Sequence, residues 1–287
     1  MKKILLSIAL VFLICTQAWA ESSVWKIQKD NSVMYLGGTF HLLRPSDFPL
    51  PPEFAEAYRA SDLLVFETDL GKLNEPSVQE KLLAKAVYAD GSTIDQHVSG
   101  KTYRLLNEYC AVRGIPLENL KHFKPSIIAV TLASVELAKF GVAKEGVDSF
   151  FHKLATEEKK RIEGLETIDQ QIQYVVEMGA GNEDAYIAHT LRDLKSIKQD
   201  YETMVEAWRK GDLKKIDALF VAELKKTMPK LYKKLLTDRN KLWFPLLEAY
   251  HRTPEKEFIL VGAGHLAGTE GIIETLRRKG YTVEKLL

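Results

Sequence analysis

Strand-like segments occur at the two ends of the chain, and a long run of helical patterns separates them. Short apolar runs lie near the start at 23–28, 33–39 and 63–68, and near the end at 257–261 and 281–286. Between them, apolar residues recur every three or four positions, which is the period of an amphipathic helix. Because strands need partners to be stable, the two ends are expected to join one sheet.

The helical patterns are numerous enough to form most of the molecule. We expect helices at 51–60, 78–89, 101–113, 126–140, 147–157, 168–179, 182–210, 213–225 and 269–279. One further strand is expected at 161–165, inside the helical part. No glycine-rich, proline-rich or low-complexity segment divides the chain, so residues 21–287 are predicted to form one α+β domain with a large helical insertion.

The first twenty residues have the pattern of a secretory signal peptide. Lys2 and Lys3 precede an apolar core at 4–15, and the small-x-small site Ala18-Trp19-Ala20 follows. The apolar core is too short to span a membrane, so the pattern predicts export and cleavage near Ala20, with no stable membrane anchor. The mature chain is expected to be periplasmic or secreted.

The mature chain is almost neutral. Removing twenty residues and two lysines from the 287-residue chain of formal charge +1 leaves 267 residues with a formal charge of −1. A chain of that charge gives no electrostatic reason to expect nucleic acid as a partner. Its length allows a full core, and its 28% of charged residues is ordinary for a globular protein.

Cys110 is the one cysteine outside the signal peptide, so the mature chain cannot form an internal disulfide. It lies in the helical pattern at 101–113, close to Leu106 and Tyr109. A buried, inert thiol is expected in that setting, which argues against a cysteine hydrolase.

Two histidines follow glycines at the ends of strand-like runs. The first motif is Gly38-Thr39-Phe40-His41 and the second is Gly262-Ala263-Gly264-His265. Glycine makes the turn after a strand easy, and a histidine placed there can meet a metal or a substrate. A single Gly-x-x-His motif arises often by chance, so each histidine taken alone can be structural. Their shared setting favours one joint site.

Two Glu-Thr pairs also end short apolar runs, at Glu67-Thr68 and Glu166-Thr167. This faint repeat is compatible with a duplicated ancestor that acquired insertions. Histidine nitrogen and carboxylate oxygen are the ligands of Zn, Mn, Fe and Co sites, and three protein ligands leave a position open for water. His41, Glu67 and His265 are therefore the predicted metal ligands.

A longer set of motifs occurs in a recognisable order. The main ones are 35–41 (YLGGTFH), 66–69 (FETD) and 261–268 (VGAGHLAG), with 146–148 (GVD), 164–167 (GLET), Trp208, Arg239-Asn240 and 276–283 (LRRKGYTV) as further pieces. Together they resemble the TraB/GumN family (TraB/PrgY/GumN), which includes the Tiki metalloproteases. The resemblance covers nearly the whole mature chain.

The resemblance implies two related α/β halves with a mixed sheet region around a central cleft. For the Tiki branch it implies metal-dependent cleavage of peptide bonds by two Gly-x-x-His motifs and a glutamate, which correspond here to His41, His265 and Glu67. Other family members are linked to pheromone shutdown or to polysaccharide synthesis genes, so membership alone does not fix a substrate.

The predicted site contains a divalent metal ion, Mn, Co or Zn, whose bound water is acidified. Glu67 is either a ligand or the general base. If Glu67 is a ligand, Glu166 becomes the candidate base; if Glu67 is the base, the metal needs another ligand or more water. The sequence leaves both alternatives open.

Arg239 and Asn240 are further catalytic candidates because of the resemblance. An arginine and an amide can bind a substrate carboxylate or stabilise an oxyanion, although the pair alone would suggest a surface ion pair and a helix cap. Three residues form a second rank of candidates: Asp69, Asp148 and Gln171.

The remaining conspicuous features are expected to be structural. The helical pattern at 182–210 has an apolar face suited to core packing, and the lysines at 225–234 suit a solvated helix face. The sequence thus predicts an exported metal-dependent hydrolase, first of all a peptidase, acting on a peptide or small molecule. The alternatives are a non-catalytic periplasmic binding or sequestering protein and an envelope polysaccharide assembly factor.

Overall fold

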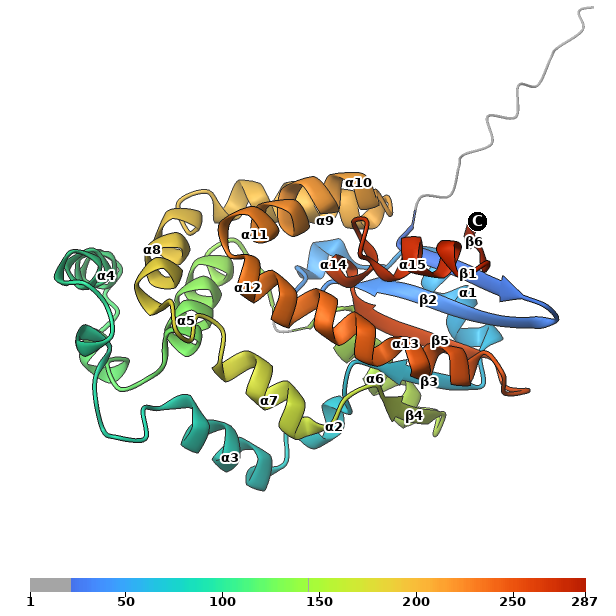
Figure 1. Ribbon diagram of the computed structural model, residues 1–287, viewed down its shortest axis with the longest axis horizontal. Helices are drawn as coiled ribbons and strands as arrows, with labels where there is room; N and C mark the ends of the chain where they lie inside the picture. Colours follow the sequence, from blue (N-terminus) through green and yellow to red (C-terminus); the bar gives the residue numbers. More distant parts are fainter. Residues whose placement is uncertain (1–21, 144) are drawn as a thin grey trace, which may run out of the picture.

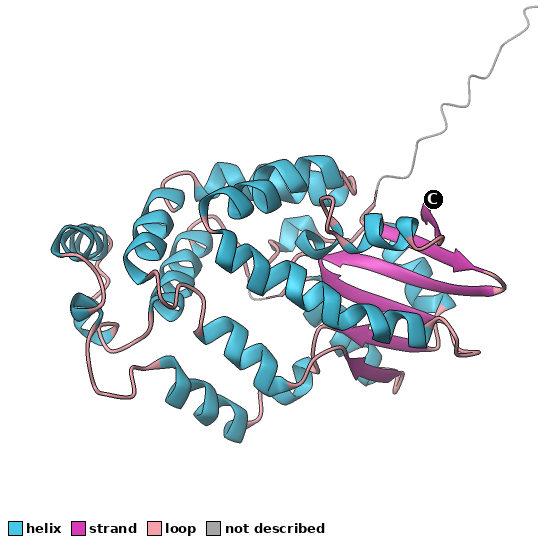
Figure 2. Ribbon diagram, in the orientation of Figure 1, coloured by secondary structure: helices cyan, strands magenta, loops and turns pink. Residues whose placement is uncertain are grey.

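One six-stranded mixed sheet lies beside a large helical region (Figures 1 and 2). The computed structural model describes residues 22–143 and 145–287. The predicted signal peptide lies outside the described residues. The strands are β1 (Val24–Lys29), β2 (Ser32–Thr39), β3 (Leu63–Phe66), β4 (Arg161–Gly164), β5 (Glu257–Gly262) and β6 (Thr282–Lys285).

The spatial order of the strands is β4-β3-β5-β2-β1-β6. β4, β3, β5 and β2 run parallel to their neighbours, whereas β1 is antiparallel to both β2 and β6. The carboxyl ends of the four parallel strands therefore meet at one edge. In Figure 1 this edge faces the helical region.

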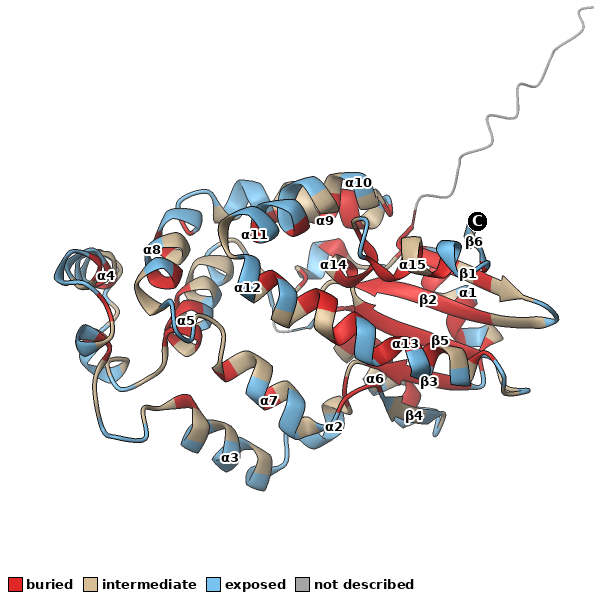
Figure 3. Ribbon diagram, viewed as in Figure 1, coloured by how far each residue is buried: buried red, intermediate tan, exposed pale blue. Residues whose placement is uncertain are grey.

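Helices cover both faces of the sheet. One face packs on α1 (Pro52–Ala60), α6 (Val147–Glu157) and α9 (Ile197–Arg209); the other packs on α13 (Asp238–Tyr250) and α15 (Ile272–Arg278). Along β5, Phe258 and Leu260 belong to the first core, and Ile259 and Val261 belong to the second. Burial on both faces explains the continuous apolar runs of the central strands, which Figure 3 shows as buried.

A third apolar cluster lies within the helical region, away from the sheet. It is formed by residues between Ile94 and Ile197 and contains Cys110, which has no exposed surface. The prediction that this thiol is buried is confirmed, and burial raises its pKa. The remaining helices are α2 (Leu70–Leu73), α3 (Pro76–Ala86), α4 (Gly100–Val112), α5 (Pro125–Ala138), α7 (Ile168–Val176), α8 (Glu183–Asp193), α10 (Leu213–Ile216), α11 (Ala222–Thr227), α12 (Pro229–Tyr232) and α14 (Ala263–Leu266).

The single helix predicted at 182–210 is wrong, because α8 ends at Asp193 and α9 begins at Ile197. The apolar face of α8 packs in the helical cluster, whereas that of α9 packs against the sheet. Ser196 supports the break, since its hydroxyl donates to the carboxylate of Asp200 over 2.6 Å and lies 3.3 Å from the Asp193 carbonyl. The chain turns where its apolar face passes from one core to the other.

Two long helical stretches contain π-helical segments, at Asp217–Val221 between α10 and α11 and at Lys233–Thr237 between α12 and α13. Both segments contact α14, the short helix that follows β5. A π-helical segment inserts one residue into the helical repeat and often accompanies a functional site. In the part of the chain that the structure describes, no helix is long and apolar enough to cross a membrane.

The α+β class, the mixed sheet and the shared sheet of the two chain ends are confirmed. The strand expected at 161–165 is β4. Trp208 links the helical region to the sheet through two hydrogen bonds. Its Nε1 donates to the Gly38 carbonyl over 2.7 Å, and its carbonyl accepts from the Ser23 hydroxyl over 2.5 Å.

Replacing Trp208 by phenylalanine tests this link. Trp208→Phe keeps an aromatic ring but loses the donor to a buried carbonyl, so the free energy of unfolding should fall by about 1–2 kcal/mol. Urea unfolding of the purified protein measures the change. Leu105→Ala, at a half-exposed position on α4, serves as the control and should change stability by less than about 0.5 kcal/mol.

Candidate functional site

The strand order brings the predicted site residues together. Glu166 follows β4, Glu67 follows β3, His265 follows β5 by three residues, and His41 follows β2 by two. Since these strands are neighbours and parallel, the four side chains stand in a row at the carboxyl edge of the sheet. This edge is where open α/β sheets bind ligands.

Three of these side chains converge on one point, beside the α-carbon of Gly262. A Cβ atom on this glycine would lie 3.2 Å from Glu67 Oε1, 3.6 Å from His41 Nε2 and 3.7 Å from His265 Cδ2. His265 Nε2 is itself 3.8 Å from Glu67 Oε1. Because Gly262 has no side chain, a space remains beside it that His41, Glu67 and His265 border. We call it the shared space.

His265 is buried and neutral. Burial lowers its pKa to about 3, more than Glu67 raises it. Arg239 Nη1 donates to Nε2 over 3.2 Å, which assigns the ring proton to Nδ1, and Nδ1 donates to Asn240 Oδ1 over 2.7 Å. The Trp243 ring packs against the imidazole at 4.4 Å between centroids. Asn240 thus fixes the tautomer, and the Nε2 lone pair is directed at Arg239.

His41 is held in the same way but is more exposed. Its Nδ1 lies 2.8 Å from Asp148 Oδ2 in the first turn of α6, and two thirds of its side chain is exposed. Asp148 raises the pKa of His41 to about 9 against the effect of desolvation, an increase that the surrounding solvent weakens. Gly146 permits this contact, since a Cβ there would overlap the backbone oxygens of Phe40 and His41.

Arg239 links the carboxylates to His265. Nε and Nη2 donate to the two oxygens of Glu166, each over 2.8 Å, and Nη2 also donates to Glu67 Oε2 over 2.5 Å. Nη1 donates to His265 Nε2 and, over 3.4 Å, to the Leu235 carbonyl. All five N–H groups of the guanidinium are therefore engaged.

Glu166 is a buried anchor for this arginine. Its side chain is 1% exposed, and beyond the two bonds from Arg239 it accepts from Trp243 Nε1 over 2.9 Å and from Gln171 Nε2 over 2.7 Å. With its lone pairs occupied in this way, the carboxylate holds Arg239 in place and lies behind it as seen from the shared space.

Glu67 is the carboxylate that faces the shared space. Burial raises its pKa, but Arg239, His41 and the backbone N–H of Gly262 more than compensate and bring the pKa far below its usual value. Its Oε1 accepts from the backbone N–H of Gly262 over 2.8 Å. Glu67 is thus ionised, with Oε2 bound to Arg239 and Oε1 directed toward His265.

The site opens onto a cleft of about 940 Å³. Of the six residues predicted as ligands or catalytic groups, the residues that line this cleft are His41, Glu67, Arg239 and His265. Glu166 and Asn240 lie behind them and act as positioning residues. Asn240 has no free group for a substrate, because its Nδ2 donates to the carbonyls of His265 and Glu270.

Of the three second-rank candidates, two belong to the site and one does not. Asp148 and Gln171 belong to the site through their bonds to His41 and Glu166. Asp69 does not, because it caps α2, where its Oδ1 accepts from the Gly71 N–H and lies 3.2 Å from His152 Nε2.

The donors suit a divalent metal in type. In each histidine another residue holds Nδ1, as is usual around a metal-bound histidine. Nε2 of His41 lies beside Gly262, whereas Nε2 of His265 accepts from Arg239. Within residues 22–143 and 145–287, however, no group of three His, Cys, Asp or Glu residues is already spaced to hold a metal ion. Arg239 supplies the positive charge beside Glu67 in this structure.

Comparison with protein-family models places this chain. A model described as the TraB/PrgY/gumN family matches residues 23–285. The chain belongs to this family. No curated protein matched it, and no solved structure did. The resemblance seen in the motifs is thereby confirmed, over the segment that carries every residue of the candidate site.

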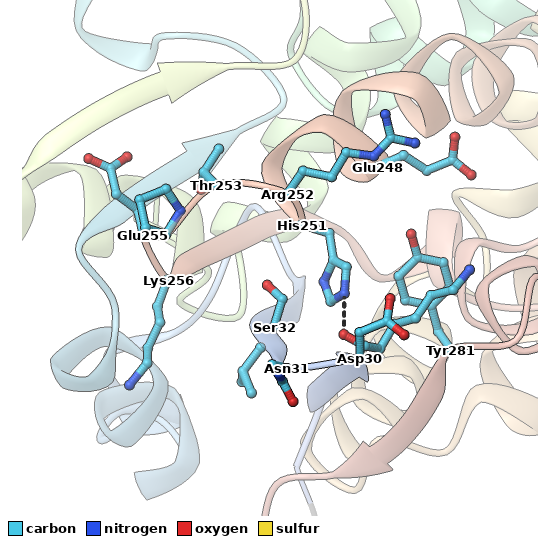
Figure 4. Close-up of a pocket in the computed structure, with 13 residues that line it drawn as sticks. Asp30, Asn31, Ser32, Glu248, His251, Arg252, Thr253, Glu255, Lys256 and Tyr281 are labelled. Carbon is cyan, nitrogen blue, oxygen red and sulfur yellow. Dashed lines mark hydrogen bonds between the residues drawn. The ribbon is translucent and has the colours of Figure 1, made fainter.

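A second hollow of this TraB/PrgY/gumN protein lies at the opposite end of the sheet (Figure 4). It has about 610 Å³ and is lined by residues of both charges around the β1–β2 turn and the end of α13. His251, at its centre in Figure 4, bonds the Lys29 carbonyl through Nε2 over 2.9 Å. None of the predicted site residues lines this hollow.

Sequence reasoning missed two aromatic residues of the site, Tyr174 and Trp243. Their rings lie on Arg239, with 4.9 Å and 4.8 Å between the guanidinium carbon and the ring centroids. A signal existed, because Trp243 follows Arg239 by four residues and so shares its helix face. Tyr174 follows Gln171 by three residues on α7 in the same manner.

Removing the charge of Glu166 tests its anchoring role. Glu166→Gln leaves the buried guanidinium with a single carboxylate partner, Glu67, and should lower the free energy of unfolding by about 3 kcal/mol. Denaturant unfolding measures the loss. Glu255→Gln is the matched control, because Glu255 pairs with Arg161 at the exposed surface, where an ion pair contributes about 1 kcal/mol or less.

Proposed function

We propose that the protein is an exported metal-dependent hydrolase that cleaves peptide bonds in the 940 Å³ cleft. The observation that carries this proposal is the convergence of His41, Glu67 and His265 on the space beside Gly262. These side chains come from the ends of three neighbouring parallel strands, and the TraB/PrgY/gumN match covers all of them. Export is part of the proposal and rests on the signal-peptide pattern of the first twenty residues.

The three side chains would hold the ion and orient the substrate. Asp148 and Asn240 fix the two imidazoles through Nδ1. Nε2 of His41 lies beside Gly262, and Nε2 of His265 would exchange its bond from Arg239 for one to the ion. A bound Mn, Co or Zn ion would supply a Lewis acid for the scissile carbonyl and an acidified water. The helices around the cleft would exclude bulk water from the reacting bond.

Glu67 has the central role among these residues. Its ionised carboxylate is held through Oε2 by Arg239, which stops the side chain from turning away. Oε1 faces His265 Nε2 and is the atom that would bind the ion or take the proton of the attacking water. Arg239 acts by positioning this carboxylate, because its own donors are all engaged.

A peptide-binding protein without catalysis is the second candidate function. The engagement of Arg239 with Glu67 and His265 favours it, because the guanidinium already neutralises the charge that would attract a cation. The size of the cleft suits such a protein equally well.

Cleavage of a mixed peptide library tests the hydrolase. We expect the purified protein to cleave library peptides when Mn, Co or Zn is added and to lose that activity with a chelator. His41→Ala and His265→Ala should each lower kcat/KM at least about a hundredfold, since removing a ligand removes the ion. Peptide binding that needs no metal, with no cleavage by the wild type, would establish the binding protein instead.

Glu67→Gln in the same assay separates the two roles of the glutamate. An amide keeps an oxygen but cannot take a proton. If Glu67 is the base, turnover should fall while metal affinity, followed by calorimetry, stays within about threefold of the wild-type value. If Glu67 is a ligand, metal affinity should fall by about tenfold or more.

Gly262→Ala tests whether the shared space is where chemistry occurs. The backbone of Gly262 is extended (φ −50°, ψ 133°), so alanine fits without strain, but its methyl group would lie 3.2 Å from Glu67 Oε1. Cleavage should fall at least about tenfold with little change in stability, because the methyl takes the place of the reacting groups. Gly100→Ala, at an open position in α4, should leave cleavage unchanged; equal activity in both variants would place the reaction elsewhere.

A further inference from the structure

The cleft extends well beyond the site, along one face of α9. Ile197, Tyr201, Met204 and Trp208 line it at helical spacing. Trp208 marks the end beside the site, since its Nε1 donates to the Gly38 carbonyl of β2. Eleven residues of helix separate Ile197 from Trp208, which gives a trough of about 16 Å at 1.5 Å per residue.

The other walls of this trough are also apolar. They come from α5, α7, α8 and the two π-helical segments, and their apolar lining residues include Ala133, Leu137, Val175, Leu194, Leu219, Phe220, Leu235 and Leu236. Leu219 and Phe220 keep 42% and 41% of their surface exposed. Large apolar side chains left open along a cleft indicate an apolar ligand.

The dimensions suit an extended peptide. At about 3.3 Å per residue, a trough of about 16 Å accommodates about five residues of extended chain. Its floor begins at the strand ends that carry His41 and Glu67, so a peptide lying along α9 would present one of its bonds to the candidate site.

Beyond the candidate site, the charges along the trough are negative. Asp193, Asp200 and Glu223 line it, whereas the one lysine or arginine among its described lining residues is Arg239, whose donors are engaged. Asp193 contacts His189 and Arg192. Asp200 and Glu223, by contrast, form no salt bridge within residues 22–143 and 145–287. An apolar trough with two carboxylates that form no salt bridge with the described residues is complementary to an apolar segment that carries a positive charge.

The position of Asp200 predicts where the positive residue lies along a bound peptide. It precedes Trp208 by eight residues of α9, or about 12 Å along the helix axis. An extended peptide covers that distance in about four residues.

We propose that the trough binds an extended apolar peptide segment of about five residues, with a lysine or arginine about four residues from the bond that lies at the site. The statement about the cleaved bond rests on the proposed peptidase function. The statement about binding does not, so the two can fail separately.

Binding of capped nine-residue peptides tests the proposal. Each peptide consists of leucine, alanine and phenylalanine with one variable position, which is lysine, glutamate or glutamine. Each carries a fluorophore, and binding is followed by fluorescence anisotropy in the presence of a metal chelator. At low salt the lysine peptide should bind about tenfold tighter than the glutamate peptide, since two carboxylates attract one and repel the other. In Asp200→Asn/Glu223→Gln that ratio should fall below about twofold.

The matched control is Asp95→Asn/Glu108→Gln, which removes two exposed carboxylates that do not line the trough. It should keep the wild-type ratio and so exclude a general effect of net charge. Equal affinity of wild type for the lysine and glutamate peptides would overturn the proposal. The proposal would also be overturned if the protein bound a long-chain alkylamine but none of the peptides.

Cleavage with added metal then separates the two proposals. Mass spectrometry of the products from a series with the lysine moved along the peptide should show cut bonds three to five residues from the lysine. Lysine-dependent binding without cleavage would support the trough and overturn the peptidase. Cleavage at bonds unrelated to the lysine would support the peptidase and overturn the trough's register.

Discussion

The buried guanidinium of Arg239 is the contact on which the site depends. It bonds two carboxylates that follow different strands, and a histidine that follows a third. Without a cation between them, Glu67 and Glu166 would repel each other in a buried setting, and one would take up a proton. The rings of Tyr174 and Trp243 keep the guanidinium in place. One arginine thus joins the ends of β3, β4 and β5 into a single rigid edge.

The sheet and the main site residues were accessible from the sequence because they follow local rules. Short apolar runs ending in glycine or Glu-Thr located β2, β3, β4 and β5, and the family resemblance named His41, Glu67 and His265. Parallel order then brings strand ends together without further information. What the sequence could not supply was the order of the strands itself, since pairing between residues 200 positions apart leaves no local pattern.

The roles of the neighbouring residues were harder to predict. Arg239 and Asn240 are expected from the sequence to touch substrate. In the structure, the Arg239 donors bond Glu67, Glu166, His265 and the Leu235 carbonyl, and the Asn240 amide donates to the carbonyls of His265 and Glu270. These contacts depend on the three-dimensional fold. The break between α8 and α9 has the same origin. No glycine or proline marks it, and only the meeting of two separate cores requires the turn at Ser196.

The place of β5 in the sheet has a consequence for folding. This strand begins at Glu257 yet lies between β2 and β3, whose residues precede it by about two hundred positions. Until β5 arrives, β2 and β3 each present an unpaired edge, and the loop that must close has about two hundred residues. Folding is therefore expected to be slow and to begin only after synthesis is almost complete. A chain shortened at its carboxyl end would lose the centre of its sheet together with His265, and would be prone to aggregate.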